Sequence, residues 1–205
     1  MDIQLNLINQ SNQQDHQQVV IFQKNVATTF DERAVAWRVV NNLGMNENHP
    51  FVFPMAMDVQ AGDSDGNFSP IVEGADGQMF DYALNGSGNG LSASGDSPSP
   101  LEVQIRNRLE KGAISASILK DGRKLATKTS VAPNQKAVFK FKPTLWIGVV
   151  SDVVEGKIID SAVLSDVNTE LSLLGLVSAD IVMRGGGPGA SSAPITFTLQ
   201  NKVFA

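Results

Sequence analysis

The sequence predicts an all-β protein: an antiparallel β-sandwich of jelly-roll or immunoglobulin-like topology, with at most one or two short helices. Two observations predict this class. Apolar and polar side chains alternate along several stretches, and Asp-Gly or Gly turn signals separate those stretches. Alternation with a period of two puts the apolar side chains on one face of an extended strand. Strands of this kind bury that face against a second sheet, as in a sandwich.

Four stretches alternate most clearly, and we expect each of them to form a strand with one face in water. The apolar side chains of each stretch are expected on a single face. These sets are Ile3, Leu5 and Leu7; Phe51, Phe53, Met55, Met57 and Val59; Leu101, Val103 and Ile105; and Ala137, Phe139 and Phe141.

The strongest turn signal is Asp121-Gly122, which stands between two alternating runs in SILKDGRKLATK. Both central residues of a type I′ turn need positive φ, which Asp and Gly tolerate, so we predict a β-hairpin here. In the last third, TLWIGVV at 144–150 is typical of a strand covered on both faces. Residues 30–44 and 165–175 fit either a helix or a strand, and the β-branched residues of 30–44 favour a strand there.

Two tracts rich in Gly, Ser and Pro interrupt the pattern, LNGSGNGLSASGDSPSP at 84–100 and RGGGPGASSAP at 184–194. We interpret both as surface loops of one sandwich domain that spans 1–205. The alternative is two small β domains, 1–84 and 101–205, joined by the first tract. A faint similarity between QQVVIFQKNVATTF and QKAVFKFKPTLWIG does not establish a repeat.

The composition of the 205 residues is globular, with 42% hydrophobic residues and no cysteine. Disulfides, thiolate metal sites and cysteine nucleophiles are therefore excluded. The N-terminal residues lack the charged and apolar regions of a secretory signal, and no stretch has the roughly 20 apolar residues of a transmembrane segment. We expect a soluble, cytoplasmic protein, and export by a signal-independent route remains open.

Charge is unevenly distributed along the chain, whose net charge is −5. Residues 51–100 contain seven acidic residues and no Lys or Arg, whereas residues 106–142 contain ten basic residues against Glu110 and Asp121. We expect the strands to interleave, so that these charges mix in space. The alternative is a molecule with an acidic and a basic face.

The segment Gly62-Asp63-Ser64-Asp65-Gly66 matches the G-x-S-x-G pattern of a serine hydrolase. That pattern works when a helix follows the serine and presents it beside an oxyanion hole. Here NFSPIVEG follows, which contains a proline and strand-forming residues, and two aspartates would oppose an oxyanion. A hydrolase at Ser64 is thus the least favoured function, and we predict an acidic turn.

The same segment also offers oxygen ligands for calcium. EF-hand spacing fails, because Ala61 would occupy the first ligand position and Val72 the last. A weaker site formed by Asp63, Asp65 and Asn67, with Asp58 as a further oxygen, is the calcium hypothesis. We expect no other cofactor.

A basic set of residues is the candidate surface for an anionic partner or a glycan. The aromatic residues between the lysines point to the opposite face of their strand, so the signal for nucleic-acid binding is weak. Lysines that protect a solvated strand from aggregation are the alternative interpretation. The set consists of Arg123, Lys124, Lys136, Lys140 and Lys142.

Two histidines, no cysteine and no assembled catalytic group lead us to expect a non-enzymatic protein. The function we predict is that of a structural or interaction protein that acts by binding or by self-assembly into a homo-oligomer or filament. The alternative is a toxin-like or lectin-like β protein, exported without a signal, that engages membranes or glycans through the two Gly-rich tracts.

Overall fold

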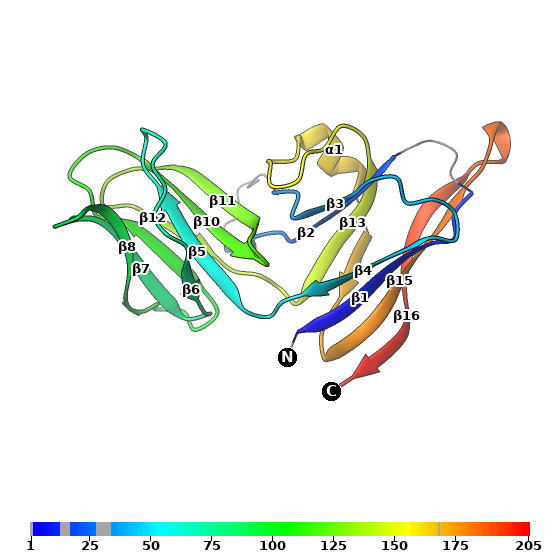
Figure 1. Ribbon diagram of the computed structural model, residues 1–205, viewed down its shortest axis with the longest axis horizontal. Coiled ribbons are helices and arrows are strands. Elements are labelled where there is room, and N and C mark those ends of the chain that lie inside the picture. The colour runs from blue at the N-terminus through cyan, green and yellow to red at the C-terminus, as the bar shows by residue number, and fades with distance from the viewer. Residues whose placement is uncertain (1, 13–16, 28–33, 168) are drawn as a thin grey trace. The chain divides into compact units, whose positions relative to one another are not determined.

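The computed structural model describes residues 2–12, 17–27, 34–167 and 169–205, apart from the side chains of residues 165 and 166. The described chain is nearly all β, as predicted, with one short helix, α1 (Ser161–Asp166), and one 3₁₀ turn, Gly189–Ser191. It packs as two compact units, which are described separately below (Figure 1). Neither described helix is of the length and apolar character that a membrane crossing requires.

Unit 1 contains Met1–Gln23, Ala36–Met55 and Pro143–Ala205. It is a sandwich of two four-stranded sheets, with strand orders β16-β15-β1-β4 and β14-β13-β2-β3. Its strands are β1 (Ile3–Asn9), β2 (Gln18–Phe22), β3 (Arg38–Val40), β4 (Asn48–Phe53), β13 (Thr144–Val150), β14 (Thr169–Ser172), β15 (Leu176–Gly186) and β16 (Ala193–Phe204).

Unit 2 contains Lys24–Val35 and Ala56–Lys142. It is also a sandwich of two four-stranded sheets, with strand orders β12-β9-β7-β8 and β11-β10-β5-β6. Its strands are β5 (Met57–Gly62), β6 (Val72–Gly74), β7 (Gln78–Asn85), β8 (Gly88–Asp96), β9 (Val103–Asn107), β10 (Ile114–Lys120), β11 (Arg123–Val131) and β12 (Lys136–Phe139).

Alternation along the strands produces the core of each unit. In unit 1, Trp37 is fully buried, and its ring lies 6.2 Å from Phe51 and 5.4 Å from Phe53 in edge-on contacts. In unit 2, the core contains Phe80 and Phe139. Aromatic side chains bury the largest areas and therefore dominate the stability of cores of this size.

The two units have the same strand order. When the chain is divided into its first and last eight strands, β1–β4 correspond to β9–β12, and β5–β8 correspond to β13–β16. Under this correspondence β16-β15-β1-β4 matches β8-β7-β9-β12, and β14-β13-β2-β3 matches β6-β5-β10-β11. Directions match as well: β1·β15 and β7·β9 are parallel, and every other pairing among the described strands is antiparallel.

Individual hydrogen bonds confirm the correspondence. Asn9 ends β1 and Asn107 ends β9, and each is buried. The amide of Asn9 donates to Glu47 O at 3.0 Å, and the amide of Asn107 donates to Gln135 O at 2.9 Å. Their carbonyls accept from Asn46 N at 2.6 Å and from Asn134 N at 2.8 Å, respectively. Asn46 and Asn134 both have positive φ, 64° and 62°.

We therefore call β1–β8 repeat 1 and β9–β16 repeat 2, and the first and last four strands of a repeat its N half and its C half. Unit 1 consists of the N half of repeat 1 and the C half of repeat 2. Unit 2 consists of the C half of repeat 1 and the N half of repeat 2, with residues 24–35 added. Neither unit is formed by one repeat alone.

Several predictions about local structure are confirmed. Asp121 and Gly122 have φ of 53° and 68° and connect β10 to β11, where Lys120 pairs with Arg123. Ile3, Leu5 and Leu7 are all buried on one side of β1. Of the ambiguous segments, 30–44 contains β3 and 165–175 contains β14, although residues 30–33 and 168 lie outside the described chain.

The predicted strand across 51–59 is wrong. β4 ends at Phe53 in unit 1, and β5 begins at Met57 in unit 2. Pro54 follows β4, and a proline has no N–H to donate to a strand ladder. The apolar residues keep alternating across this break because the odd-numbered apolar residues are buried in both strands.

The predicted loop at 84–100 is also wrong. Gly88–Asp96 form β8, which pairs with β7 from Asn85 opposite Gly88 to Gln78 opposite Asp96. Gly and Ser have low strand propensity. β8 nevertheless forms because its backbone pairs with β7, and this pairing does not depend on side chains. The tract at 184–194 shortens in the same way, because β15 continues to Gly186 and β16 begins at Ala193. Whether either unit folds alone is a question of stability, so both predicted domain divisions stay predictions.

The acidic and basic segments do not interleave within the sheets of unit 2, so that expectation is wrong. In the orders β11-β10-β5-β6 and β12-β9-β7-β8, the strands from 56–100 lie side by side, as do those from 103–142. The two segments meet only where β10 pairs with β5 and β9 pairs with β7, and the alternative of an acidic and a basic face stays a prediction.

Candidate functional site

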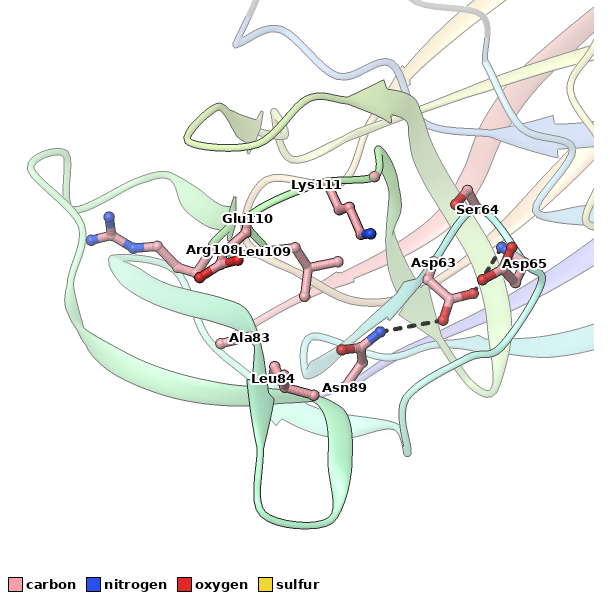
Figure 2. A pocket seen from close by; sticks show the side chains of 11 residues that line it. Asp63, Ser64, Asp65, Ala83, Leu84, Asn89, Arg108, Leu109, Glu110 and Lys111 are labelled. Carbon is pink, nitrogen blue, oxygen red and sulfur yellow. Dashed lines mark hydrogen bonds between the residues drawn. The ribbon is translucent and has the colours of Figure 1, made fainter.

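A hollow of about 730 Å³ at one end of unit 2 is the candidate ligand site (Figure 2). Three segments form its walls: the turn at 63–65 after β5, the β7–β8 hairpin, and the loop 108–112 after β9. Figure 2 shows Asp63 and Asn89 pointing toward one another across its edge, and Leu109 and Lys111 extending from the loop.

Asp63 organises the first wall as an acidic turn, which confirms the prediction. Its Oδ1 accepts from the backbone amides of Asp65 and Asn67, each at 3.0 Å, and its Oδ2 accepts from Asn67 Nδ2 at 3.1 Å. Gly66 supplies the positive φ of 88°. The hydrogen bonds from Asn67 hold the pKa of Asp63 below its ordinary value, so the carboxylate is ionised at neutral pH.

The calcium hypothesis gains no additional ligand from this geometry. Asp63 and Asn67 lie together, but their contact is a hydrogen bond in which the carboxylate accepts from the amide. Among the residues that the structure describes, no three His, Cys, Asp or Glu side chains are grouped so as to hold a metal ion. A calcium site at Asp63, Asp65 and Asn67 stays a prediction.

Ser64 lacks the surroundings of a hydrolase nucleophile. No helix follows it; Gly62 bridges Phe68 across the turn, and β6 comes next. The residues that line the hollow include no histidine, and His49 lies on β4 in unit 1. The elbow implied by the G-x-S-x-G letters is therefore not formed at Ser64.

The loop 108–112 is held in place by Asn107, a residue that the sequence analysis missed. Asn107 Nδ2 donates to Gly112 O at 2.8 Å and to Val131 O at 2.9 Å, and its Oδ1 accepts from Leu109 N at 3.0 Å. An asparagine directly after an alternating run is the available signal, since its side chain readily accepts from the backbone two residues later. A buried amide whose nitrogen and oxygen both have backbone partners fixes the position of this wall.

Asp81 forms an ion pair beside Arg108, one of the residues that line the hollow. Arg106 donates to both carboxylate oxygens of Asp81, at 2.6 and 2.9 Å, and Arg108 Nε lies 3.6 Å from the same carboxylate. Burial raises the pKa of Asp81, but the hydrogen bonds from Arg106 and the two positive charges outweigh burial, so the pKa lies below its ordinary value.

The hollow therefore presents charges of both signs beside an apolar edge. Asp63, Asp65, Glu110 and Lys111 line it, and Leu84 is 74% exposed on the hairpin. Carboxylates and amides of this kind form hydrogen bonds with hydroxyl and amine groups of a polar ligand. Chemically, the arrangement is suited to binding.

The residues of the predicted basic set lie on or after strands of two sheets of unit 2. Arg123 and Lys124 begin β11 and Lys136 begins β12, and these strands belong to different sheets of unit 2. Lys124 Nζ lies 5.2 Å from the centre of the Phe68 ring, and Lys136 Nζ donates to Gln104 at 2.8 Å. Lys140 and Lys142 follow the end of β12. The hypothesis that these five residues hold an anionic partner or a glycan stays a prediction.

Two edge strands, one in each unit, are further candidate surfaces. β8 and β16 correspond to each other in the two repeats, and each is the outermost strand of its sheet in the described chain. They have 9 and 12 residues, and most of their side chains are exposed. β8 contains no proline and no basic residue, whereas β16 has Pro194 and Lys202 only near its ends. Long edges of this kind present backbone N–H and C=O groups to any added strand.

Comparisons of the chain with known proteins found no relative: no family model, no curated protein and no solved structure matches it.

Proposed function

We propose that the protein is a non-catalytic structural or interaction protein that assembles with copies of itself by adding strand to strand. The observation that carries this proposal is the pair of corresponding edges, β8 and β16, exposed at the same position in both sandwiches. Each copy then has two edges, and contacts through two edges continue into a ring or filament. The cytoplasm is the compartment we expect, with signal-independent export as the alternative.

Charge supports the role of these edges. Natural proteins protect exposed edges with lysine, proline or bulges. From Ile195 to Asn201, β16 carries no charged residue, and from Gly88 to Gly95 neither does β8. The ladders of β8 and β16 contain bulges, but the central stretches of both edges lack lysine and proline, and this favours pairing between molecules.

Sedimentation velocity over a range of protein and salt concentrations tests the proposal. We expect the natural protein to associate as its concentration rises, and Ser92→Lys with Thr198→Lys to stay monomeric, because lysine at an edge opposes strand addition. The control is Gln4→Lys, which adds a charge to an exposed position of a central strand and should associate like the natural protein. A natural protein that is monomeric under all these conditions contradicts the proposal.

The hollow in unit 2 favours a second function, lectin-like binding of a glycan. Asp63, Asp65 and Asn89 offer side-chain acceptors and donors at one rim, the groups that bind sugar hydroxyls. A glycan array tests it: Asp65→Ala should remove a signal that Lys202→Ala, at an exposed position of β16 in unit 1, retains. An array with no bound glycan contradicts this second function.

A further inference from the structure

The arrangement of repeats points to a partner for unit 1. We infer that a second copy of this chain can complete unit 1, the N half of repeat 1 from one copy pairing with the C half of repeat 2 from another. This inference does not depend on edge-strand assembly. It rests on how the chain is divided between the units and on the surface that joins the halves.

The first step concerns continuity. Unit 2 contains the uninterrupted stretch Ala56–Lys142, so its two halves are adjacent in sequence. The two halves of unit 1 lie on either side of that stretch. If unit 1 opens, unit 2 keeps its strands, and the chain then carries one free half at each side.

The second step concerns the seam between the halves. In unit 1 it consists of the parallel pairing of β1 with β15 and the antiparallel pairing of β13 with β2. In unit 2 the corresponding seam is β9 with β7 and β5 with β10, in the same directions. The chain therefore already makes the half-to-half contact twice, each time between different repeats.

The third step concerns the outcome. A free N half and a free C half on the same molecule are complementary to each other, so two opened molecules close into a dimer, or many join head to tail. Exchange of identical elements forms oligomers at low cost, because the exchanged contacts are those of the monomer. Closure within one chain competes at an effective concentration on the order of millimolar, so exchange requires concentrated protein and an opened unit 1.

The natural chain has no cysteine, so a pair of engineered cysteines reports directly which chains are joined. Gln4 and Ser178 are paired residues across the β1–β15 seam, and neither is buried. Adjacent strands bring paired Cα atoms within the range that a disulfide spans. The full-length variant Gln4→Cys/Ser178→Cys is unfolded in urea, refolded at about 1 µM or at about 1 mM, and then oxidised with glutathione disulfide.

The control places its disulfide inside one half. Arg184 and Thr196 are paired exposed residues of β15 and β16, so Arg184→Cys/Thr196→Cys closes within a chain however the halves are exchanged. Circular dichroism establishes that each variant is folded. A second measurement, native gels of tagged and untagged natural chains refolded together, needs no cysteine.

The expected result on a non-reducing gel is a ladder of linked chains for the seam pair at about 1 mM. Its oligomer fraction should be at least about tenfold above that at about 1 µM, since intramolecular closure wins in dilute solution. The control pair should give only single chains. Single chains for the seam pair at both concentrations, without mixed oligomers of natural chains, overturn the inference. Equal ladders for both pairs also overturn it, because linkage is then unspecific.

Discussion

Unit 2 is built almost entirely from residues 56–142, whereas unit 1 is assembled from residues 1–23, 36–55 and 143–205, and yet both have the same strand order and the same strand directions. Chain continuity therefore does not determine this fold. What the units share is a pair of complementary four-strand halves, closed by a buried asparagine at the end of β1 or β9.

The two units differ in the residues that pair where their halves meet. Arg106 pairs with Asp81 across the β7–β9 seam, and the corresponding pair across the β1–β15 seam is Ile8 with Val182. An ion pair in one unit thus replaces an apolar contact in the other at the same register. The connection also differs: β10 and β11 are joined by the tight turn at Asp121, whereas residues 24–35 between β2 and β3 belong to unit 2.

Cutting the chain between the repeats is the largest covalent change, and we expect the fold to survive it. With a protease site inserted between Ser97 and Pro100, the two fragments should co-elute in size-exclusion chromatography, because each unit contains strands of both repeats. They should separate only in denaturant. Fragments that separate in native buffer would show that each repeat folds on its own.

Asn9 and Asn107 test whether the units are equally dependent on their buried amides. Asn9 Nδ2 donates to Leu43 O at 2.7 Å, and Asn107 Nδ2 donates to the corresponding Val131 O. Replacing either by Ala leaves buried backbone groups without partners and should cost about 2–3 kcal/mol.

Urea unfolding separates the two effects, because both tryptophans, Trp37 and Trp146, belong to unit 1. Asn9→Ala should lower the midpoint seen by tryptophan fluorescence, and Asn107→Ala should lower that seen by circular dichroism while leaving fluorescence less affected. Gln4→Ala, at an exposed position of β1, is the control and should change stability by less than about 0.5 kcal/mol. Equal shifts in both signals for both variants would contradict separate units.

The ion pair should have an intermediate effect. Asp81→Asn leaves Arg106 without its carboxylate and should cost about 1–2 kcal/mol at pH 7, the partly exposed side chains limiting the loss. Because the folded pKa of Asp81 is lowered, its contribution is present above the unfolded pKa and disappears as the pH falls through the folded value. Urea midpoints from pH 7 to pH 3 measure this.

The matched control copies the other seam. Arg106→Ile with Asp81→Val gives unit 2 the apolar pair of unit 1, and we expect stability close to that of the natural protein with a weaker loss in acid. A double variant as unstable as Asp81→Asn would show that the two seams are not interchangeable at this position.

His49 should give the smallest difference. It lies on β4 at the position that corresponds to Ala137 of β12 in the other repeat. Burial, together with the charge of Arg38, lowers the pKa of His49. The unfolded chain then binds a proton more readily, so stability should decline as the pH falls below about 6.5. His49→Ala should remove that part of the slope between pH 7 and pH 5 in thermal unfolding, and an unchanged slope would contradict this assignment.

Local pattern was enough to predict the class of fold. The alternation of Ile3, Leu5 and Leu7 with polar residues was enough to predict which side of the strand is buried. Asp121-Gly122 predicted a turn because both residues tolerate positive φ. Each signal is contained in a few neighbouring residues. β8 was missed because Gly and Ser carry little strand preference, and its partner β7 decides its structure.

The repeat escaped detection for a different physical reason. The positions that correspond share backbone geometry more than side chains: Asn46 with Asn134, and Gly77 with Gly175, all have positive φ. The similarity noticed between 17–30 and 135–148 joins β2 to β12, which do not correspond. Of the hollow, only the acidic turn at Asp63 was predictable, because its other walls come from segments that distant pairings bring together.

The parallel pairing of β1 with β15 also determines when unit 1 can form during synthesis. The ribosome releases β1–β4 early, but the strands of unit 1 that pair with β1 and β2 are β15 and β13, which are translated late. The apolar faces of β1–β4 therefore stay without these partners while some hundred residues are added. At typical elongation rates that interval is roughly 5–30 s. Unit 2 completes its sandwich within this time, and the waiting segment is the one that chaperones or a neighbouring nascent chain on the same polysome would meet first.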